Sequence, residues 1–413
     1  MTEQAKVPAI RFAGFTDPWE QRKLGEIADK VTEKNLDGNI TEVLTNSAEY
    51  GVINQTEFFD HAVAKESNIA GYYVIAPGDF VYNPRISATA PVGPIRRNTL
   101  GIHGVMSPLY TVFRLTDAVD GTYLSHFFKT NGWHGFMKLE GNSGARSDRF
   151  SIGDATFFEM PIPVPSSSEQ HAIGSFFSRL DDLITLHQRK YDKLVIFKKS
   201  MLEKMFPKDG ESVPEIRFAG FTDPWEQRKL ENLASFGGGH TPSMADASNY
   251  VDGKILWVTS QDVKQHYIEN TTTMISEKGA ATLTLYPSDS IVIVARSGIL
   301  RHTIPVAKLR KPATVNQDIK VIQTVDSCDS SWLLQYFIAS NKTLLREYGK
   351  TGTTVESIDF AKMKSTALMV PYIEEQQAIG SFFSRLDNLI TLHQRKLELL
   401  QDIKKSLLDK MFV

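Results

Sequence analysis

The chain of 413 residues, 41% of them hydrophobic, is too long for one hydrophobic core and long enough for two or more globular domains. A single cysteine, Cys328, excludes an internal disulfide, and no apolar run approaches the roughly 20 residues that cross a bilayer, so we expect a cytoplasmic protein with no membrane partner. The net charge of −2 gives no global sign of a nucleic-acid partner.

One segment near the N-terminus, FAGFTDPWEQRKL at 12–24, returns unchanged at 218–230. A second segment, at 169–206, returns nearly unchanged at 375–412, and each copy lies 206 positions after the original. The chain is therefore two copies of one unit. The first segment either serves the same partner, or the same domain–helix junction, twice, or it is a packing segment with its tryptophan in the core. Both interpretations stay open.

The middle of each copy, about 31–150 and 237–356, scarcely aligns with the other. Runs rich in β-branched and aromatic residues, bounded by Gly, Pro, Asn and Asp, predict strands and their turns. One helical stretch follows in each middle, near 121–139 and 330–348. We therefore predict α+β domains, with a shared task for the copied ends and different tasks for the middles. The strand-forming runs lie at 72–82, 107–115, 254–263 and 289–298.

Basic residues gather in two stretches that contain no acidic residue, 80–116 and 290–317, at nearly the same place in each copy. Each stretch is either a solvated surface or a region that contacts nucleic-acid phosphates and base edges. Two loops, 141–149 and 349–354, also occupy equivalent places, and their Gly, Ser and Thr residues let backbone N–H groups and hydroxyls approach phosphates, unless they are plain surface turns. The predicted DNA-binding residues are Asn83, Arg85, Arg96, Arg97, Arg146, Arg149, Arg296, Ser297, Arg301, His302, Gln317, Lys350, Thr353 and Thr354.

Apolar residues recur every three or four positions through both copies of the 169–206 segment, which predicts a long α-helix in each. The stripe lasts for over four heptads, as is typical of a coiled coil. Because a whole domain separates the two helices, we expect them to pair antiparallel, as rods of roughly 55 Å that space the two domains. The alternative is that each helix packs on its own domain. The residues predicted for helix pairing and partner docking are Phe176, Leu180, Leu183, His187, Tyr191, Phe382, Leu386, Leu389, His393 and Leu397.

Motifs for catalysis are missing from the sequence. YNPR at 82–85 lacks the second proline and the aromatic residue of a methyltransferase loop, and GKT at 349–351 lacks the glycine that a phosphate-binding loop needs at Leu344. The histidines show no metal-ligand spacing. The simplest conclusion is that the chain catalyses nothing and binds no metal or cofactor by itself.

The helix entries PIPVPSSSEQHAIGSFFSRLDDLI and VPYIEEQQAIGSFFSRLDNLI, with two variable domains at a fixed offset, resemble the DNA-specificity subunit of type I restriction–modification enzymes. The second middle is similar to that family's target-recognition domain in LYPSDSIVIVARSG and in TGTTVESI, and the first resembles it more loosely in YYVIAPGDFVYNPR and GNSGARSDRFSI. The resemblance spans the whole chain. It implies two target-recognition domains and two spacer helices, which we place at 1–168, 169–207, 208–374 and 375–413.

The resemblance further implies a non-catalytic subunit that reads a bipartite sequence in double-stranded DNA, one half-site per domain. It implies two modification subunits that methylate adenine with S-adenosylmethionine, and one or two restriction subunits that use ATP and magnesium. A hypothesis of another class is a duplicated coiled-coil adaptor whose variable domains bind protein or carbohydrate. The near-neutral charge favours the adaptor, whereas the paired basic stretches count against it.

Overall fold

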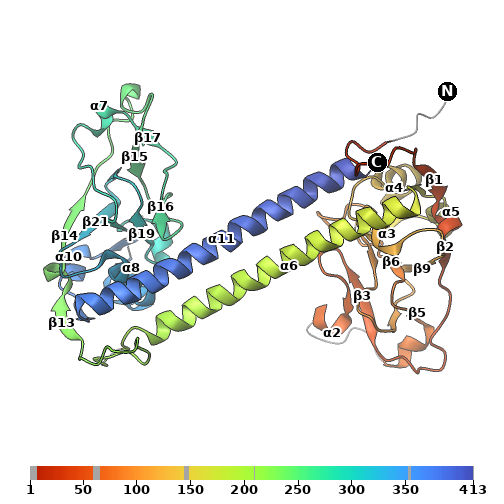
Figure 1. The fold of residues 1–413 in the computed structure, drawn as a ribbon, viewed down its shortest axis with the longest axis horizontal. Coiled ribbons are helices and arrows are strands. Elements are labelled where there is room, and N and C mark those ends of the chain that lie inside the picture. Colours follow the sequence, from red (N-terminus) through yellow and green to blue (C-terminus); the bar gives the residue numbers. More distant parts are fainter. Residues whose placement is uncertain (1–6, 59–65, 144–147, 209, 352–354, 413) are drawn as a thin grey trace. The chain divides into compact units, whose positions relative to one another are not determined.

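The structure is a computed structural model that describes residues 7–58, 66–143, 148–208, 210–351 and 355–412. Internal contacts divide the chain into two compact units. The first unit joins Met1–Gln188 to Arg395–Val413, and the second comprises Arg189–Gln394. The predicted α+β class, the internal repeat and the two long antiparallel helices are confirmed (Figure 1).

The first unit is built on two four-stranded sheets, with strand orders β2-β9-β6-β7 and β4-β3-β8-β5. The pair β3–β8 is parallel, and β6, at the centre of its sheet, is buried along its whole length. Two short antiparallel pairs, β1–β12 and β10–β11, complete the unit. Its strands are β1 (Glu20–Lys23), β2 (Ala28–Lys30), β3 (Val43–Ser47), β4 (Gly51–Asn54), β5 (Tyr73–Ile75), β6 (Phe80–Tyr82), β7 (Ile95–Arg97), β8 (Gly104–Met106), β9 (Thr111–Leu115), β10 (Asn142–Ser143), β11 (Phe150–Ser151) and β12 (Pro161–Val164).

Helices cover the sheets of the first unit and carry much of its aromatic core. Asp120 begins α3, because its carboxylate accepts a hydrogen bond from the backbone N–H of Tyr123 at 2.7 Å. The helical elements are α1 (Leu24–Ile27), α2 (Gln55–Phe58), η1 (Glu66–Gly71), α3 (Gly121–Phe127), α4 (His134–Glu140), α5 (Asp154–Phe158) and the first part of α6 (Ser167–Lys204).

The second unit has a five-stranded sheet, β14-β21-β18-β19-β16, and a three-stranded sheet, β17-β15-β20. Within them, β15–β20 is parallel, as β3–β8 is in the first unit, and β18 is buried throughout. The pairs β13–β24 and β22–β23 correspond to β1–β12 and β10–β11. The strands are β13 (Glu226–Lys229), β14 (Ala234–Gly238), β15 (Ile255–Val258), β16 (Tyr267–Ile268), β17 (Met274–Ile275), β18 (Ile291–Val294), β19 (Val306–Leu309), β20 (Ala313–Val315), β21 (Ile319–Thr324), β22 (Gly349–Lys350), β23 (Ser357–Ile358) and β24 (Ala367–Val370).

Helical elements of the second unit follow the same plan, with Asp329 accepting from Trp332 N at 2.8 Å to begin α8. The two helical stretches expected from the sequence, near 121–139 and 330–348, each contain two helices rather than one. The elements are η2 (Leu230–Asn232), η3 (Ala247–Asn249), α7 (Glu277–Ala280), η4 (Gly298–Arg301), α8 (Ser330–Ala339), α9 (Asn341–Tyr348), α10 (Phe360–Lys364) and the first part of α11 (Ile373–Met411).

Each long helix starts on its own unit through an identical set of contacts. Glu169 in α6 accepts two hydrogen bonds from Arg11, at 2.8 and 2.7 Å, and a third from Trp19 Nε1 at 3.1 Å. In α11, Glu375 accepts the same three bonds from Arg217 and Trp225 at the same distances. The copied N-terminal segment therefore has a structural task, which is to fix the start of the helix.

A glycine in each long helix permits a close approach to the next helix of the unit. A Cβ on Gly380 would lie 2.5 Å from the Oδ1 of Asp329, and one on Gly174 would lie 3.1 Å from the backbone nitrogen of Tyr123. Any larger residue would push the long helix away from the capped end of α8 or α3. This contact explains why the AIGSFF sequence is kept in both copies.

Each long helix ends in the core of the unit in which it did not begin. Met411 and Phe412, at the end of α11, are buried in the first unit, where the Phe412 ring lies 5.5 Å from that of Tyr123. Met205 and Phe206 are buried in the second unit, and the Phe206 ring lies 6.3 Å from that of Phe383. Each hydrophobic core is thus completed by the last turn of the other copy's helix.

Candidate nucleic-acid interface

An exposed arginine follows the central buried strand of each unit. Arg85 comes three residues after β6, and its side chain is 63% exposed. Arg296 comes two residues after β18 and is also exposed. Because both strands are buried along their length, these arginines are the first charged side chains that the chain brings to the surface as it leaves the sheet.

In the first unit, the loop that carries Arg85 is tied to the β10–β11 hairpin. Arg85 and Arg149 form an isolated antiparallel bridge. Backbone hydrogen bonds run from Phe150 N to Pro84 O at 2.8 Å and from Ile86 N to Asp148 O at 3.0 Å. The Arg85 guanidinium lies 3.7 Å from the carboxylate of Asp148. The predicted loop and the predicted arginine therefore form one local structure.

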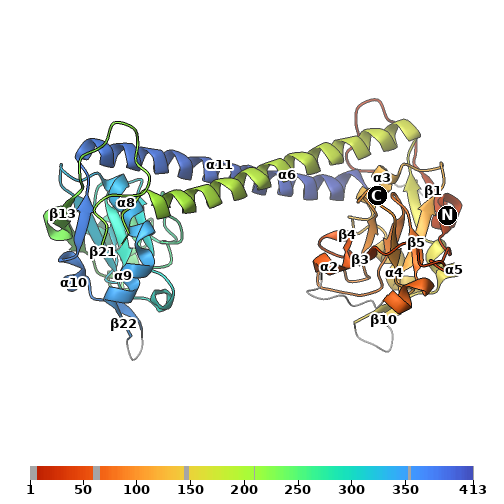
Figure 2. The same cartoon turned by 90° about the horizontal axis from the view of Figure 1, so that it is seen from below.

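The second unit repeats this arrangement with different side chains. Arg296 and Ser357 form the corresponding bridge to the β22–β23 hairpin. Ile358 N donates to Ala295 O at 3.0 Å, and Ser297 N donates to Glu356 O at 3.1 Å. Figure 2 shows β10 and β22 each at the end of its unit away from the long helices. The predicted residues Arg146, Thr353 and Thr354 lie outside the described residues.

Acidic residues neutralise part of the predicted positive charge. Arg301 pairs with Glu356, and this hydrogen bond holds the pKa of the Glu356 carboxyl below its usual range. Lys350 pairs with Asp359 at 2.8 Å and lowers the pKa of that carboxyl in the same way. Among the residues that the structure describes, Arg296 has no ion-pair partner, and its side chain is exposed, so its charge is available to a ligand.

Three predicted residues of the first unit are engaged in internal contacts. Arg96 is half-buried and donates to the backbone oxygens of Ile95 at 3.0 Å and Ala48 at 2.9 Å, and burial lowers its pKa. Arg97 donates to Thr122 Oγ1 at 3.3 Å. Asn83 donates to Asn46 O at 2.8 Å. These contacts shape the loops, and DNA contacts by the three residues stay predictions.

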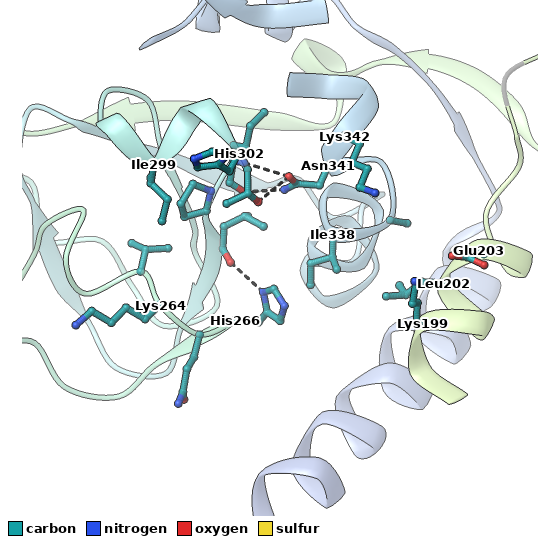
Figure 3. Close-up of a pocket in the computed structure, with 17 residues that line it drawn as sticks. Lys199, Leu202, Glu203, Lys264, His266, Ile299, His302, Ile338, Asn341 and Lys342 are labelled. Atoms are coloured by element: carbon teal, nitrogen blue, oxygen red, sulfur yellow. Dashed lines mark hydrogen bonds between the residues drawn. The ribbon is translucent and has the colours of Figure 1, made fainter. Parts of the chain in front are cut away.

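His302 lies on the wall of a cavity of about 610 Å³ in the second unit (Figure 3). Apolar side chains of Ile299, Ile304 and Ile338 contribute to its lining, and Lys199 and Lys342 stand at its edge. A separate cavity of about 850 Å³ in the first unit is lined in part by the equivalent positions of the repeat. These are Lys405, Leu408 and Asp409, the repeat counterparts of Lys199, Leu202 and Glu203.

Nowhere in the described ranges do three or more His, Cys, Asp or Glu side chains come together as metal ligands. Asn341, one of the lining residues, is engaged within the fold, since it accepts from Thr303 Oγ1 and Ile304 N and donates to Ile304 O. The described chain also has no helix long and apolar enough to span a membrane.

The family described as "Type I restriction modification DNA specificity domain" matches residues 16–195 and again residues 222–402. The chain belongs to this family.

Curated specificity subunits resemble the chain in sequence, and a solved structure resembles it in fold. The chain is 27% identical to the EcoR124I/EcoR124II specificity subunit of Escherichia coli over 59% of its own length, and 29% identical to the MjaIX specificity subunit of Methanocaldococcus jannaschii over 46%. The matches span only 62% and 44% of those two relatives. The type I restriction–modification S subunit of M. genitalium shares the fold, with a TM-score of 0.63, 13% identity and 99% of both chains covered.

Only some of the apolar residues predicted for the long helices are buried, and the most deeply buried helix residues, such as Phe177 and Phe383, were not among those predicted. Leu180, Leu386 and Leu397 are buried, whereas Leu183 and Leu389 are 40% and 46% exposed. These two leucines occupy the same repeat position, and partner docking by them stays a prediction. The remaining predicted residues, Phe176, His187, Tyr191, Phe382 and His393, are half-buried.

A set of charged side chains that pair at the long helices was not among the predicted residues. In the first unit Asp181 pairs with Lys129 at 3.0 Å and with Lys404. Burial raises the pKa of Asp181, but the two lysines outweigh it and leave that pKa below its usual value. His126 packs beside them, and burial, followed by the charge of Lys129, lowers its pKa to about 3. The sequence signal for this set was the recurrence of Asp181 and Lys404 at the 206-residue offset, as Asp387 and Lys198.

Proposed function

We propose that this chain is the DNA sequence-recognition subunit of a type I restriction–modification complex, with each unit reading one half of a bipartite target. The observation that carries the proposal is the repeated arrangement of Arg85 and Arg296 beside a hairpin. It occurs in two domains whose sequences scarcely align, at the same place relative to the central strand. The same placement of an arginine in two divergent domains is expected if both domains bind DNA and each reads a different half-site.

The chemistry of the arrangement suits duplex DNA. A guanidinium can donate two hydrogen bonds to the O6 and N7 of guanine in the major groove, or can contact phosphate. The hairpins supply backbone N–H groups and hydroxyls suited to phosphates. Different turns around the two arginines then give each unit its own base preference.

The repeated segments are proposed to dock two identical modification subunits. Burial of Trp19 and Leu24 in the first unit, and of their counterparts Trp225 and Leu230, explains why those positions are copied. Exposed positions around them are copied as well, although the fold itself places no such demand on them. The exposed pairs are Thr16 and Thr222, Asp17 and Asp223, Pro18 and Pro224, Glu20 and Glu226, Gln21 and Gln227, and Lys23 and Lys229.

Catalysis is proposed to reside wholly in the partners of this chain. Modification subunits would supply S-adenosylmethionine-dependent methylation of adenine, and one or two restriction subunits would supply ATP- and magnesium-dependent translocation and cleavage. The complex would act in the cytoplasm, on chromosomal and invading DNA. The alternative of a coiled-coil adaptor for protein or carbohydrate has no support in the family assignment.

The test is to produce the chain together with modification subunits of its family's complexes and to sequence the methylated bases of the host genome. A bipartite motif with one methylated adenine in each half is expected. Binding of the purified complex to a duplex that contains the motif should weaken steeply as salt rises, because arginine and lysine contacts release counterions. Absence of any motif, with binding insensitive to salt, would refute the proposal.

A further inference from the structure

The strand registers place two short turns, 107–110 and 316–319, in equivalent positions. Val81 pairs with Val112 in the first unit, and Val292 pairs with Val321 in the second, so the strands that follow the turns coincide. Each turn is also closed by the same backbone bond, from Tyr110 N to Ser107 O at 3.0 Å and from Ile319 N to Asn316 O at 3.3 Å.

In each unit the turn leads into the strand that pairs with the strand before the arginine, since Tyr82 pairs with Thr111 and Val294 pairs with Ile319. In the second unit, Ala295 N donates to Asp318 O at 2.7 Å, and Ala295 directly precedes Arg296. In the first unit, Pro84 precedes Arg85 and has no N–H to donate, so this bond has no counterpart. The two turns therefore share a place relative to the strand-end arginine but differ in local contacts.

The exposed side chains of the two turns differ in chemistry. The turn of the second unit presents Gln317, which is exposed, and the Thr241 hydroxyl donates to its Oε1 at 2.6 Å. That bond holds the carboxamide in one orientation, and its N–H₂ group donates a long hydrogen bond to Asp318 Oδ2 at 3.5 Å, which leaves its second N–H available. The turn of the first unit presents Pro108 and Leu109, and Leu109 is 59% exposed with no polar atom in its side chain.

A glutamine held in this way has the donor and acceptor that adenine requires. The N6 amino group of adenine donates and its N7 accepts in the major groove, and a carboxamide can satisfy both at once. Leu109 cannot make those bonds, so the first unit cannot read an adenine in this way at the matching position.

We propose that Gln317, positioned by Thr241, is a specificity-determining residue that reads an adenine in the half-site of the second unit. The inference rests on the proposed function, since it assumes that the strand-end arginines face DNA. It adds to that function the base that is recognised, the residue that contacts this base and the residue that orients the contacting side chain.

The test uses the full chain in complex with the modification subunits and compares methylated motifs genome-wide. Gln317→Leu should reduce discrimination at one A·T position of one half-site by on the order of 10-fold to 100-fold, and leave the other half-site unchanged. Gln317→Glu should shift preference at that position toward C·G, because a carboxylate accepts from the N4 of cytosine. Thr241→Val should cause a smaller loss at the same position. Gln265→Leu, which changes another exposed glutamine of the same unit, is the matched control and should leave the motif intact.

Three outcomes would overturn the inference. They are an unchanged motif in Gln317→Leu, relaxation at a position that is not A·T, and an equal loss at every sequence, which would make Gln317 a backbone contact. A melting temperature equal to that of the wild type shows that the variant is folded, as an exposed position predicts. A wild-type complex that methylates no bipartite motif would refute the proposed function instead, so the two failures are distinguishable.

Discussion

Lys198 and Asp387 form a buried ion pair between α6 and α11, with 2.5 Å between Nζ and Oδ1. The other oxygen of Asp387 accepts from Tyr267 and from Gln335, each at 3.2 Å. In the first unit the same pair recurs as Lys404 and Asp181, at the repeat offset. A charge pair has thus been retained at both helix contacts, although the domains that surround them differ.

Removal of one partner of this pair should be costly. In Lys198→Met, the Asp387 carboxylate stays buried without its opposite charge, and we expect a loss of about 3 kcal/mol in the free energy of unfolding. Adding Asp387→Asn should recover a large part of the loss, because the remaining groups are then neutral. Urea unfolding of the two single variants and the double variant measures the coupling. Strictly additive losses would show that the pair does not act as a unit.

Acid should destabilise the first unit through His126. Its folded-state pKa of about 3 lies below the unfolded value of about 6.5, so the unfolded chain binds more protons between these values. The contribution of this neutral histidine to stability is full above pH 6.5 and falls as the pH drops toward 3. The loss should reach at most about 2 to 3 kcal/mol near pH 4.5.

The chain offers its own control for His126, because Gln335 occupies the matching place in the second unit and donates to Asp387. His126→Gln should flatten the dependence of the melting temperature of the first unit between pH 4.5 and 7. Lys129, Asp181 and Lys404 face the histidine and are unchanged in this variant. A melting curve with the same pH dependence as the wild type would assign the acid sensitivity to other groups.

Loss of either strand-end arginine should affect one half-site only. If Arg296 contacts a guanine edge, Arg296→Ala should cost about 1 to 3 kcal/mol of binding and relax one position of the second unit's half-site. Arg85→Ala should do the same in the other half-site. Lys254→Ala, at another exposed cation of the second unit, is the control. Binding measured on duplexes altered one half-site at a time separates base reading from a phosphate contact, which would weaken all sequences alike.

The sequence predicted the repeat and the long helices because both depend on local pattern. The thirteen copied residues and the apolar stripe could be seen without any knowledge of tertiary contacts. The role of Glu169 could not, because its partner Arg11 lies 158 residues away and either residue alone reads as an ordinary surface charge. For Arg96, charge alone suggested DNA binding. Its guanidinium donates hydrogen bonds to two backbone oxygens, which the sequence did not reveal. Which arginines are free depends on burial, and one sequence does not determine that.

The length of α6 and α11 should determine the spacer between the two half-sites. Both α6 and α11 pack into both units, so the number of residues between their packing points determines how far apart along the helix those points lie. Four residues added after Gln188 and four after Gln394 lengthen both helices by about 6 Å at the division between the units and leave the contacts within each unit in register. Four residues added only after Leu194 would instead displace Lys198 and Phe206 from their partners in the second unit, and this variant should lose stability.

The double insertion should preserve both half-site sequences while favouring a spacer longer by about one or two base pairs, since base pairs rise by about 3.4 Å. Four residues are slightly more than one helical turn of 3.6 residues, so the insertion also rotates one end of each helix relative to the other. Methylation should therefore be weaker than in the wild type. Sequencing of methylated sites reads the half-sites and the spacer in one experiment. An unchanged spacer with full methylation, or an altered half-site sequence, would show that the helices do not determine the spacing.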